Sequence, residues 1–253
     1  MKEKGLRHKE QLFDLLIHDL TGPLAVASTS TDNLLHKADR YGPLTEAQKR
    51  VVERILRNIY KAQNLLHEMI EVFRSEEGLF KKESFWVEKV IKESLFDALD
   101  IDDPRVVERL IRSKGREELQ SVLKTQGISI EMAGRYCHSP FCHDSRKIRQ
   151  ILRNLIGNAL KYRRKEMRVS VQGEEDLFIL VEDDGLGIPK DAHEVIYKRF
   201  IRLHDAKSPE VPGYGLGLPG VKSLVEAMKG EISLKSREGW GTCFTVRIPP
   251  LSS

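Results

Sequence analysis

The sequence predicts an α+β fold in which an N-terminal helical hairpin precedes an α/β sandwich. Over the first 75 or so residues, apolar side chains recur at spacings of three, four or seven, which is the period of an amphipathic helix. From about residue 82, helical and strand patterns are intermixed without the alternation typical of a parallel sheet. We therefore expect two domains, residues 1–76 and 82–253, in a chain of 253 residues.

The helical hairpin is predicted by two apolar stripes that flank a turn. Gly42-Pro43 is a turn signal, and Thr45 is a candidate N-cap for the second helix. The stripes consist of Phe13, Leu16, Leu20, Leu24 and Ala27, and then of Val52, Ile55, Ile59, Ala62, Leu66, Met69 and Phe73. Two helices of about thirty residues leave these stripes without a third layer. We therefore expect a homodimer in which two hairpins form a four-helix bundle.

The second domain contains both types of element. Helices are predicted at 86–99, 145–162, around 195–200 and at 219–228, and strands at 127–132, 168–172, 177–183, 231–236 and 243–248. Segments 106–113 and 117–124 also have helical patterns. They lengthen the segment 97–126, which is either a partner surface or a mere decoration of the domain.

Composition limits the class of protein. Hydrophobic residues make up 40% of the chain, enough for a core, and charged residues 32%. Three cysteines are too few for a disulfide framework, so we expect a reducing, cytoplasmic environment. Neither an apolar run of eighteen residues nor a secretory leader is present. We expect no membrane contact by this chain itself, and the possibility of an upstream sensor domain is left open.

Basic residues are concentrated in one segment. The formal net charge is +4, and residues 146–168 contain nine Lys or Arg with only Glu166 opposing them. Such a segment suits nucleic acid, a small phosphate ligand or a solvated helix face. The near-neutral total and the lack of a nucleic-acid-binding motif argue against nucleic acid.

Two carboxamides and a lysine share one face of the helix at 145–162. Asn154 and Asn158 are four residues apart, and Lys161 follows one turn later. A carboxamide oxygen is a suitable ligand for Mg²⁺, which keeps several waters and nucleotide phosphates around it. This face could hold metal and phosphate together, or its residues could simply be exposed polar side chains.

An apolar strand ends at Asp183, and Gly185 and Gly187 follow at once. Glycines allow a ligand to approach the backbone closely, and a carboxylate can accept a hydrogen bond from the exocyclic amine of adenine. The alternative is an ordinary Asp-Gly turn at a strand end.

A second glycine-rich segment, with Gly213, Gly215 and Gly217, precedes the helix at 219–228. Amide groups at a helix start can face a phosphate, although a single pattern of this kind is weak evidence. The preceding loop, residues 200–212, is rich in charge and proline and is typical of a lid.

These three segments, in this order, resemble the ATP-binding domain of sensor histidine kinases and of the wider ATPase superfamily that includes Hsp90 and MutL. The closing GWGTCFTVRIP, residues 239–249, is similar to the last hairpin of that family. HDLTGPL, residues 18–24, resembles the phosphoacceptor box of the dimerising helices. The resemblance covers nearly the whole chain.

The resemblance implies an ATP-dependent protein-histidine kinase. It would phosphorylate itself on His18 with Mg·ATP and pass the phosphoryl group to an aspartate of a response regulator receiver domain. Asp19 matches the acidic neighbour that accepts or orients the imidazole proton. Pro23 removes a helical amide close to His18, which predicts a locally weakened helix.

The resemblance also implies roles within the ATP site. Asn158 would bind Mg²⁺ with support from Asn154, Lys161 would contact phosphate, and Tyr162 would pack near the base. Asp183 would read adenine, with Gly185 and Gly187 shaping its turn. Arg199 or Arg202 would neutralise charge on the transferred phosphoryl group. The hinge of the lid would be formed by Gly213, Gly215 and Gly217.

Some positions depart from the family pattern. Gly22 replaces the Thr or Asn common four residues after the histidine, so we expect weak phosphatase activity toward the receiver. Asp184 replaces the usual Asn. The cluster formed by Cys137, His138, Cys142 and His143 fits no zinc-finger spacing, and we expect Asp144 to cap the following helix instead.

Two other functions stay open. One is a degenerate kinase that acts as a dimeric, ATP-binding or ligand-free interaction module. The other is an ATP-driven clamp of the Hsp90 or MutL type, which the acceptor box and the hairpin argue against.

Overall fold

The computed structural model describes residues 2–75, 80–102, 104–113, 115–198, 201 and 215–251. The side chains of residues 2–18, among others, lie outside this description. The chain divides into two units, Met1–Arg74 and Ser75–Ser253, each of which is described here by itself.

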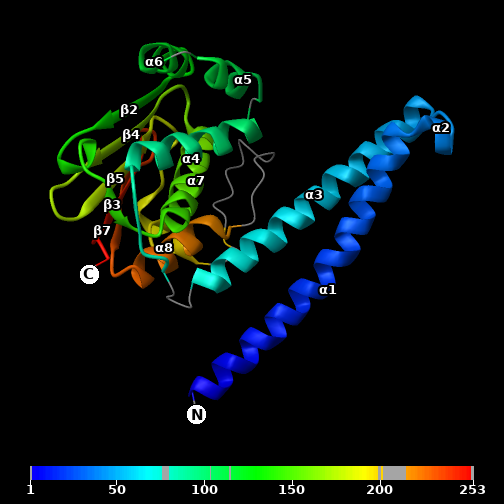
Figure 1. The fold of residues 1–253 in the computed structure, drawn as a ribbon, viewed down its shortest axis with the longest axis horizontal. Helices are drawn as coiled ribbons and strands as arrows, with labels where there is room; N and C mark the ends of the chain where they lie inside the picture. The colour runs from blue at the N-terminus through cyan, green and yellow to red at the C-terminus, as the bar shows by residue number, and fades with distance from the viewer. Residues whose placement is uncertain are drawn as a thin grey trace. The chain divides into compact units, whose positions relative to one another are not determined.

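The first unit is a helical hairpin (Figure 1). It consists of α1 (Lys2–His36), the short α2 (Ala38–Tyr41) and α3 (Glu46–Ser75). Helix α1 is unbroken at Pro23. At the start of α3, the Gln48 amide donates to Thr45 Oγ1 at 3.3 Å, and the Thr45 amide donates to Gln48 Oε1 at 2.9 Å. This reciprocal capping box confirms the predicted N-cap.

Apolar side chains of the hairpin remain exposed in the single chain. Leu20 is 50% exposed, Val26 67% and Ile55 46%. Leu66, by contrast, is buried. The described part of this unit therefore presents apolar surface that a single copy of the hairpin leaves in contact with water.

The second unit is built on a five-stranded sheet of order β2-β4-β5-β7-β6. Strand β2 (Ile128–Met132) pairs in parallel with β4 (Met167–Gln172). The other neighbours pair antiparallel, through β5 (Leu177–Asp183), β7 (Gly241–Ile248) and β6 (Glu231–Arg237). Alternate residues of β4 and β5 are buried, as expected for strands with one face toward a core.

Helices pack on one face of this sheet (Figure 1). Helix α7 (Ser145–Tyr162) contacts β4, β5 and α4 (Val87–Asp102), and α8 (Gly217–Ala227) contacts β6, β7 and α7. Helices α5 (Pro104–Arg112) and α6 (Arg116–Thr125) confirm the two predicted helical segments, and their buried residues Val106, Leu110 and Leu123 join the same core. The segment therefore extends the domain, and the predicted α/β sandwich is confirmed.

Two local predictions differ from the structure. The helix predicted around 195–200 is wrong, because the described part forms only the 3₁₀ turns Lys190–Ala192 and Val195–Tyr197. In so short a segment, too few hydrogen bonds form to offset the free-energy cost of nucleating an α-helix, whereas the 3₁₀ turn is enough to bury Ile196. The two-stranded sheet of β1 (Glu83–Phe85) and β3 (Phe141–His143) was not predicted, since three-residue strands carry almost no alternation.

Across the described residues, no helix combines the length and apolarity needed to cross a membrane.

Candidate functional site

Helix α7 carries the predicted carboxamides on its half-buried side. Its start is capped by Asp144, whose Oδ1 accepts hydrogen bonds from the amides of Arg146 and Lys147 at 3.1 and 3.3 Å, which confirms the predicted cap. Apolar residues at helical spacing attach the helix to the core: Ile148, Ile151, Leu152, Leu155, Ile156, Ala159 and Leu160. Asn154 and Asn158 lie outside this buried stripe and stay partly accessible.

The structure brings Asn154 next to the second glycine-rich segment. The Asn154 side-chain amide donates to the carbonyl of Gln150 at 3.1 Å. A Cβ added at Gly217 would lie 3.0 Å from Asn154 Oδ1. The start of α8 therefore packs directly against the carboxamide helix, and a side chain at Gly217 would require the Asn154 carboxamide to shift.

Asp183 ends β5 in a half-buried position. Its Oδ1 accepts a hydrogen bond from the Gly185 amide at 2.9 Å. Burial, and to a smaller extent the nearby Asp184, raise the pKa of Asp183 from its ordinary value of 3.8 to about 6, against the opposing backbone hydrogen bonds from Gly185 and Thr242. Asp183 also lines a hollow of about 370 Å³ together with Arg237 of β6, Thr242 of β7 and Trp240 from the turn between these strands.

The glycines after Asp183 permit two close backbone approaches. A Cβ at Gly185 would overlap the carbonyl oxygen of Tyr162 at the end of α7. Gly187 has a φ of +71°, and a Cβ there would overlap the carbonyl oxygen of Arg237. The turn after β5 is therefore in contact with both α7 and β6, and these backbone contacts by themselves require glycine at both positions.

Two further predicted residues lie at the end of α7. Lys161 Nζ is 5.0 Å from the centre of the Tyr162 ring. The Tyr162 side chain is 44% exposed. Since Tyr162 contacts the Gly185 turn through its carbonyl group, the lysine, the tyrosine and Asp183 belong to one region of the surface.

The remaining predicted residues are described only in part. Arg199, Arg202 and Gly213 lie outside the described residues, as does most of the predicted lid at 200–212. Gly215 has a φ of +70°, and a Cβ there would lie 2.6 Å from the carbonyl oxygen of Ile201.

In the hairpin unit, His18 lies on α1 with its side chain outside the description, and Asp19 is exposed on the same helix.

Sequence reasoning missed several residues around Asp183. In the ladder between β5 and β7, Thr242 is paired with Asp183. A Cβ at Gly241 would overlap the Asp183 carbonyl oxygen, and Trp240 beside it is 77% exposed. The available signal was the Gly-x-Gly-Thr pattern of residues 239–242, which was interpreted only as a hairpin.

The cysteine and histidine cluster has a structural explanation. His143 is buried, and its Nδ1 accepts the Asp144 amide at 2.8 Å while its ring stacks on Phe141. Burial lowers the pKa of His143. In the part of the chain that the structure describes, no group of three or more His, Cys, Asp or Glu could hold a metal ion.

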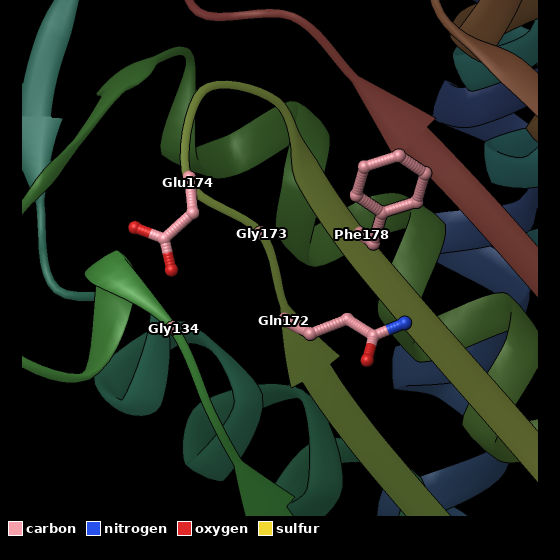
Figure 2. A pocket seen from close by; sticks show the side chains of 5 residues that line it. All are labelled: Gly134, Gln172, Gly173, Glu174 and Phe178. Atoms are coloured by element: carbon pink, nitrogen blue, oxygen red, sulfur yellow. The ribbon is translucent and has the colours of Figure 1, made fainter.

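A second hollow, of about 340 Å³, lies at the opposite end of β5 (Figure 2). Gln172 and Phe178 come from β4 and β5, and Glu174 from the turn between them. None of the predicted site residues lines it. The predicted residues Asp183, Gly185 and Gly187 lie at the other end of β5, away from this hollow.

Known proteins resemble this chain in sequence and in fold. Residues 143–252 match the family of histidine kinase-, DNA gyrase B-, and HSP90-like ATPases. The chain is 41% identical over 121 residues to the sensor histidine kinase AruS of Pseudomonas aeruginosa, which covers 43% of this chain. Residues 143–252 therefore form a domain of this ATPase family, and the relatives that this chain resembles are sensor histidine kinases.

Other sensor histidine kinases match nearly the whole chain. The circadian input-output histidine kinase CikA of Synechococcus elongatus is 27% identical over 248 residues, or 95% of this chain. The chain spans 12% of AruS and 30% of CikA, so it matches only part of the length of these relatives.

A solved structure of full-length ShkA in complex with AMPPNP has the same fold. It aligns with a TM-score of 0.71 at 21% identity, over 96% of this chain and 46% of that one.

Proposed function

We propose that this chain is the catalytic core of a sensor histidine kinase. Residues 82–253 bind Mg·ATP, and residues 1–76 form a dimerising hairpin that carries the phosphoacceptor His18. The single observation that carries the proposal is the convergence around Asp183 and α7. A half-buried carboxylate, two close-approach glycines and a carboxamide helix meet at the end of β5.

The donor set fits an adenine nucleotide. Asp183 accepts backbone hydrogen bonds from Gly185 and Thr242, and a carboxylate has acceptor capacity beyond these two for the exocyclic amine of adenine. Tyr162, whose carbonyl contacts the Gly185 turn, supplies an exposed ring, and Lys161 supplies a cation for phosphate. The solved complex of ShkA with AMPPNP supports the same choice of ligand, since that protein has the same fold.

The residues present also fit a magnesium ion. Asn158 offers a neutral oxygen, the kind of ligand that Mg²⁺ accepts beside waters and phosphates. When bound, Mg²⁺ would neutralise charge on the phosphate oxygens. Asn154, held by Gln150 and packed against Gly217, would support Asn158 from one turn earlier.

The chemical step requires little covalent help from the protein. A ring nitrogen of His18 forms a bond to the γ-phosphorus as the bond from that phosphorus to the bridging oxygen breaks, and ADP leaves. Asp19 accepts or orients the imidazole proton. In the second step the N–P bond breaks as a carboxylate oxygen of a receiver aspartate takes the phosphoryl group. Arg199 and Arg202 are the proposed cations for the charge on that group.

The hairpin supports the dimer in this proposal. Leu20, Val26 and Ile55 leave apolar surface exposed in one copy. Pairing with a second hairpin in a four-helix bundle would bury such a stripe. With three cysteines in the chain, we propose a reducing, cytoplasmic setting for this homodimer and its response regulator.

The decisive test is incubation of the purified chain with radiolabelled ATP and Mg²⁺. We expect label that is labile in acid and stable in base, lost in His18→Gln and retained in His36→Gln, a change at an exposed histidine of the same helix. Nucleotide binding without label in the wild-type chain would favour the degenerate interaction module. Absence of nucleotide binding would refute the ATP site itself.

A further inference from the structure

Asp184, the neighbour of the adenine-reading candidate, holds the loop that follows α7. Its Oδ1 accepts hydrogen bonds from the amides of Arg164 at 2.9 Å and Lys165 at 3.0 Å, and its Oδ2 lies 3.2 Å from the Lys165 amide. The Asp184 amide in turn donates to the carbonyl of Glu166 at 3.2 Å. The turn after β5 and the loop after α7 are thus joined in both directions.

This loop separates two halves of the proposed ATP site. It begins directly after Tyr162, where α7 ends, and β4 starts at Met167, which pairs with Asp183. The Tyr162 carbonyl also touches the Gly185 turn. A shift of the loop would therefore move the end of α7, with Lys161, relative to the Asp183 carboxylate.

The Asp184 carboxylate is suited to hold the loop 163–166 in place at neutral pH. Although burial opposes it, hydrogen bonds from the loop amides keep the pKa of Asp184 below its ordinary value. The group is therefore ionised at neutral pH, and hydrogen bonds to an ionised acceptor are stronger than neutral ones. Asp183, one residue earlier, lacks this set of loop donors and has a raised pKa.

We propose that Asp184 is a positioning residue for nucleotide: by anchoring the loop 163–166 it sets the spacing between the phosphate side of the site, on α7, and the base-reading Asp183. The proposal rests on the proposed function, because it concerns the same ATP site. It gives a specific role to a position where this chain differs from the family pattern.

The test compares Asp184→Ala and Asp184→Asn in the full chain. We measure Mg·ATP affinity by calorimetry and the KM and kcat of autophosphorylation. Loss of two hydrogen bonds to an ionised acceptor predicts a rise of about tenfold or more in the dissociation constant and KM of Asp184→Ala, with kcat changed less than about twofold. Asn keeps one acceptor oxygen for the loop amides, so Asp184→Asn should restore KM to within about threefold of wild type.

A matched control separates positioning from general stability. Asp176 precedes the other end of β5, and its Oδ2 forms an ion pair with Arg247 Nη1 at 2.7 Å. Asp176→Ala should lower the melting temperature without changing KM. An unchanged KM in Asp184→Ala, or an equal rise in Asp176→Ala, would overturn the proposal.

A pH profile provides a second, independent readout, and it remains available if Asp184→Ala does not fold. Asp184→Asn removes a negative charge beside Asp183, while Glu182, Lys235 and Arg237, which line the same hollow, are kept. The acid limb of nucleotide binding should therefore shift to lower pH. If Asp184→Ala does not fold, a KM of Asp184→Asn raised well beyond about threefold at pH 7 would overturn the proposal, because Asn keeps an acceptor for the loop amides. Wild-type protein that binds no Mg·ATP would refute the proposed function as well, whereas equal binding by wild type and Asp184→Ala refutes only the positioning role.

Discussion

Nucleotide affinity should depend on the ionisation of Asp183. In the proposed site, Oδ2 of this carboxylate accepts the exocyclic amine of adenine, while Oδ1 accepts the Gly185 amide. Protonation of Oδ2 would replace an acceptor with a donor. Because burial raises the pKa of Asp183 to about 6, this change falls in an accessible pH range.

The size of the effect follows from that pKa. With a value of about 6, roughly nine tenths of the carboxyl groups are ionised at pH 7 and roughly one tenth at pH 5. Affinity should therefore fall about tenfold over this interval, which corresponds to about 1.4 kcal/mol. The unfolded chain titrates at a lower pH than the folded one, so protonation of this group stabilises the empty domain. Stability from Asp183 should rise as pH falls from about 6 toward 4, while affinity decreases.

The assay is a titration of the purified chain with an ATP analogue and Mg²⁺ at pH 5, 6 and 7. Asp183→Asn is the control, because it cannot titrate and should bind weakly at every pH. Phosphate titration affects both proteins equally, so the ratio of their affinities isolates Asp183. A ratio that stays constant between pH 5 and 7 would refute the reasoning.

Three further predictions follow from other contacts. Gly185→Ala places a Cβ against the Tyr162 carbonyl, so we expect nucleotide affinity to fall more than about tenfold, checked by the same titration. Asp144→Ala removes the α7 cap and should cost about 1–2 kcal/mol, seen as a melting temperature lower by several degrees. Ile55→Glu puts a charge on the exposed stripe of the hairpin, and sedimentation should show a dimer weakened at least about tenfold, whereas an unchanged dimer would exclude this stripe as the interface.

Sequence patterns were most informative where the structure of an element depends on neighbours within that same element. The periodic burial of α7 and the Thr45 capping box were predictable because neighbours three or four residues apart meet on a helix. The prediction of a helix around 195–200 was wrong, since the 3₁₀ turn Val195–Tyr197 buries Ile196 and does not follow local helix preference.

The sequence by itself determined the order of elements, the carboxamide face of α7 and the position of Asp183 at a strand end followed by glycines. Only the tertiary structure decided what surrounds them. Gly217 lies against Asn154, and Asp184 binds amides twenty residues earlier in the chain. The raised pKa of Asp183 has the same origin, because it depends on how much water the packed domain removes from the carboxylate. Such distances and degrees of burial arise from contacts between segments far apart in the chain, and local periodicity carries no record of them.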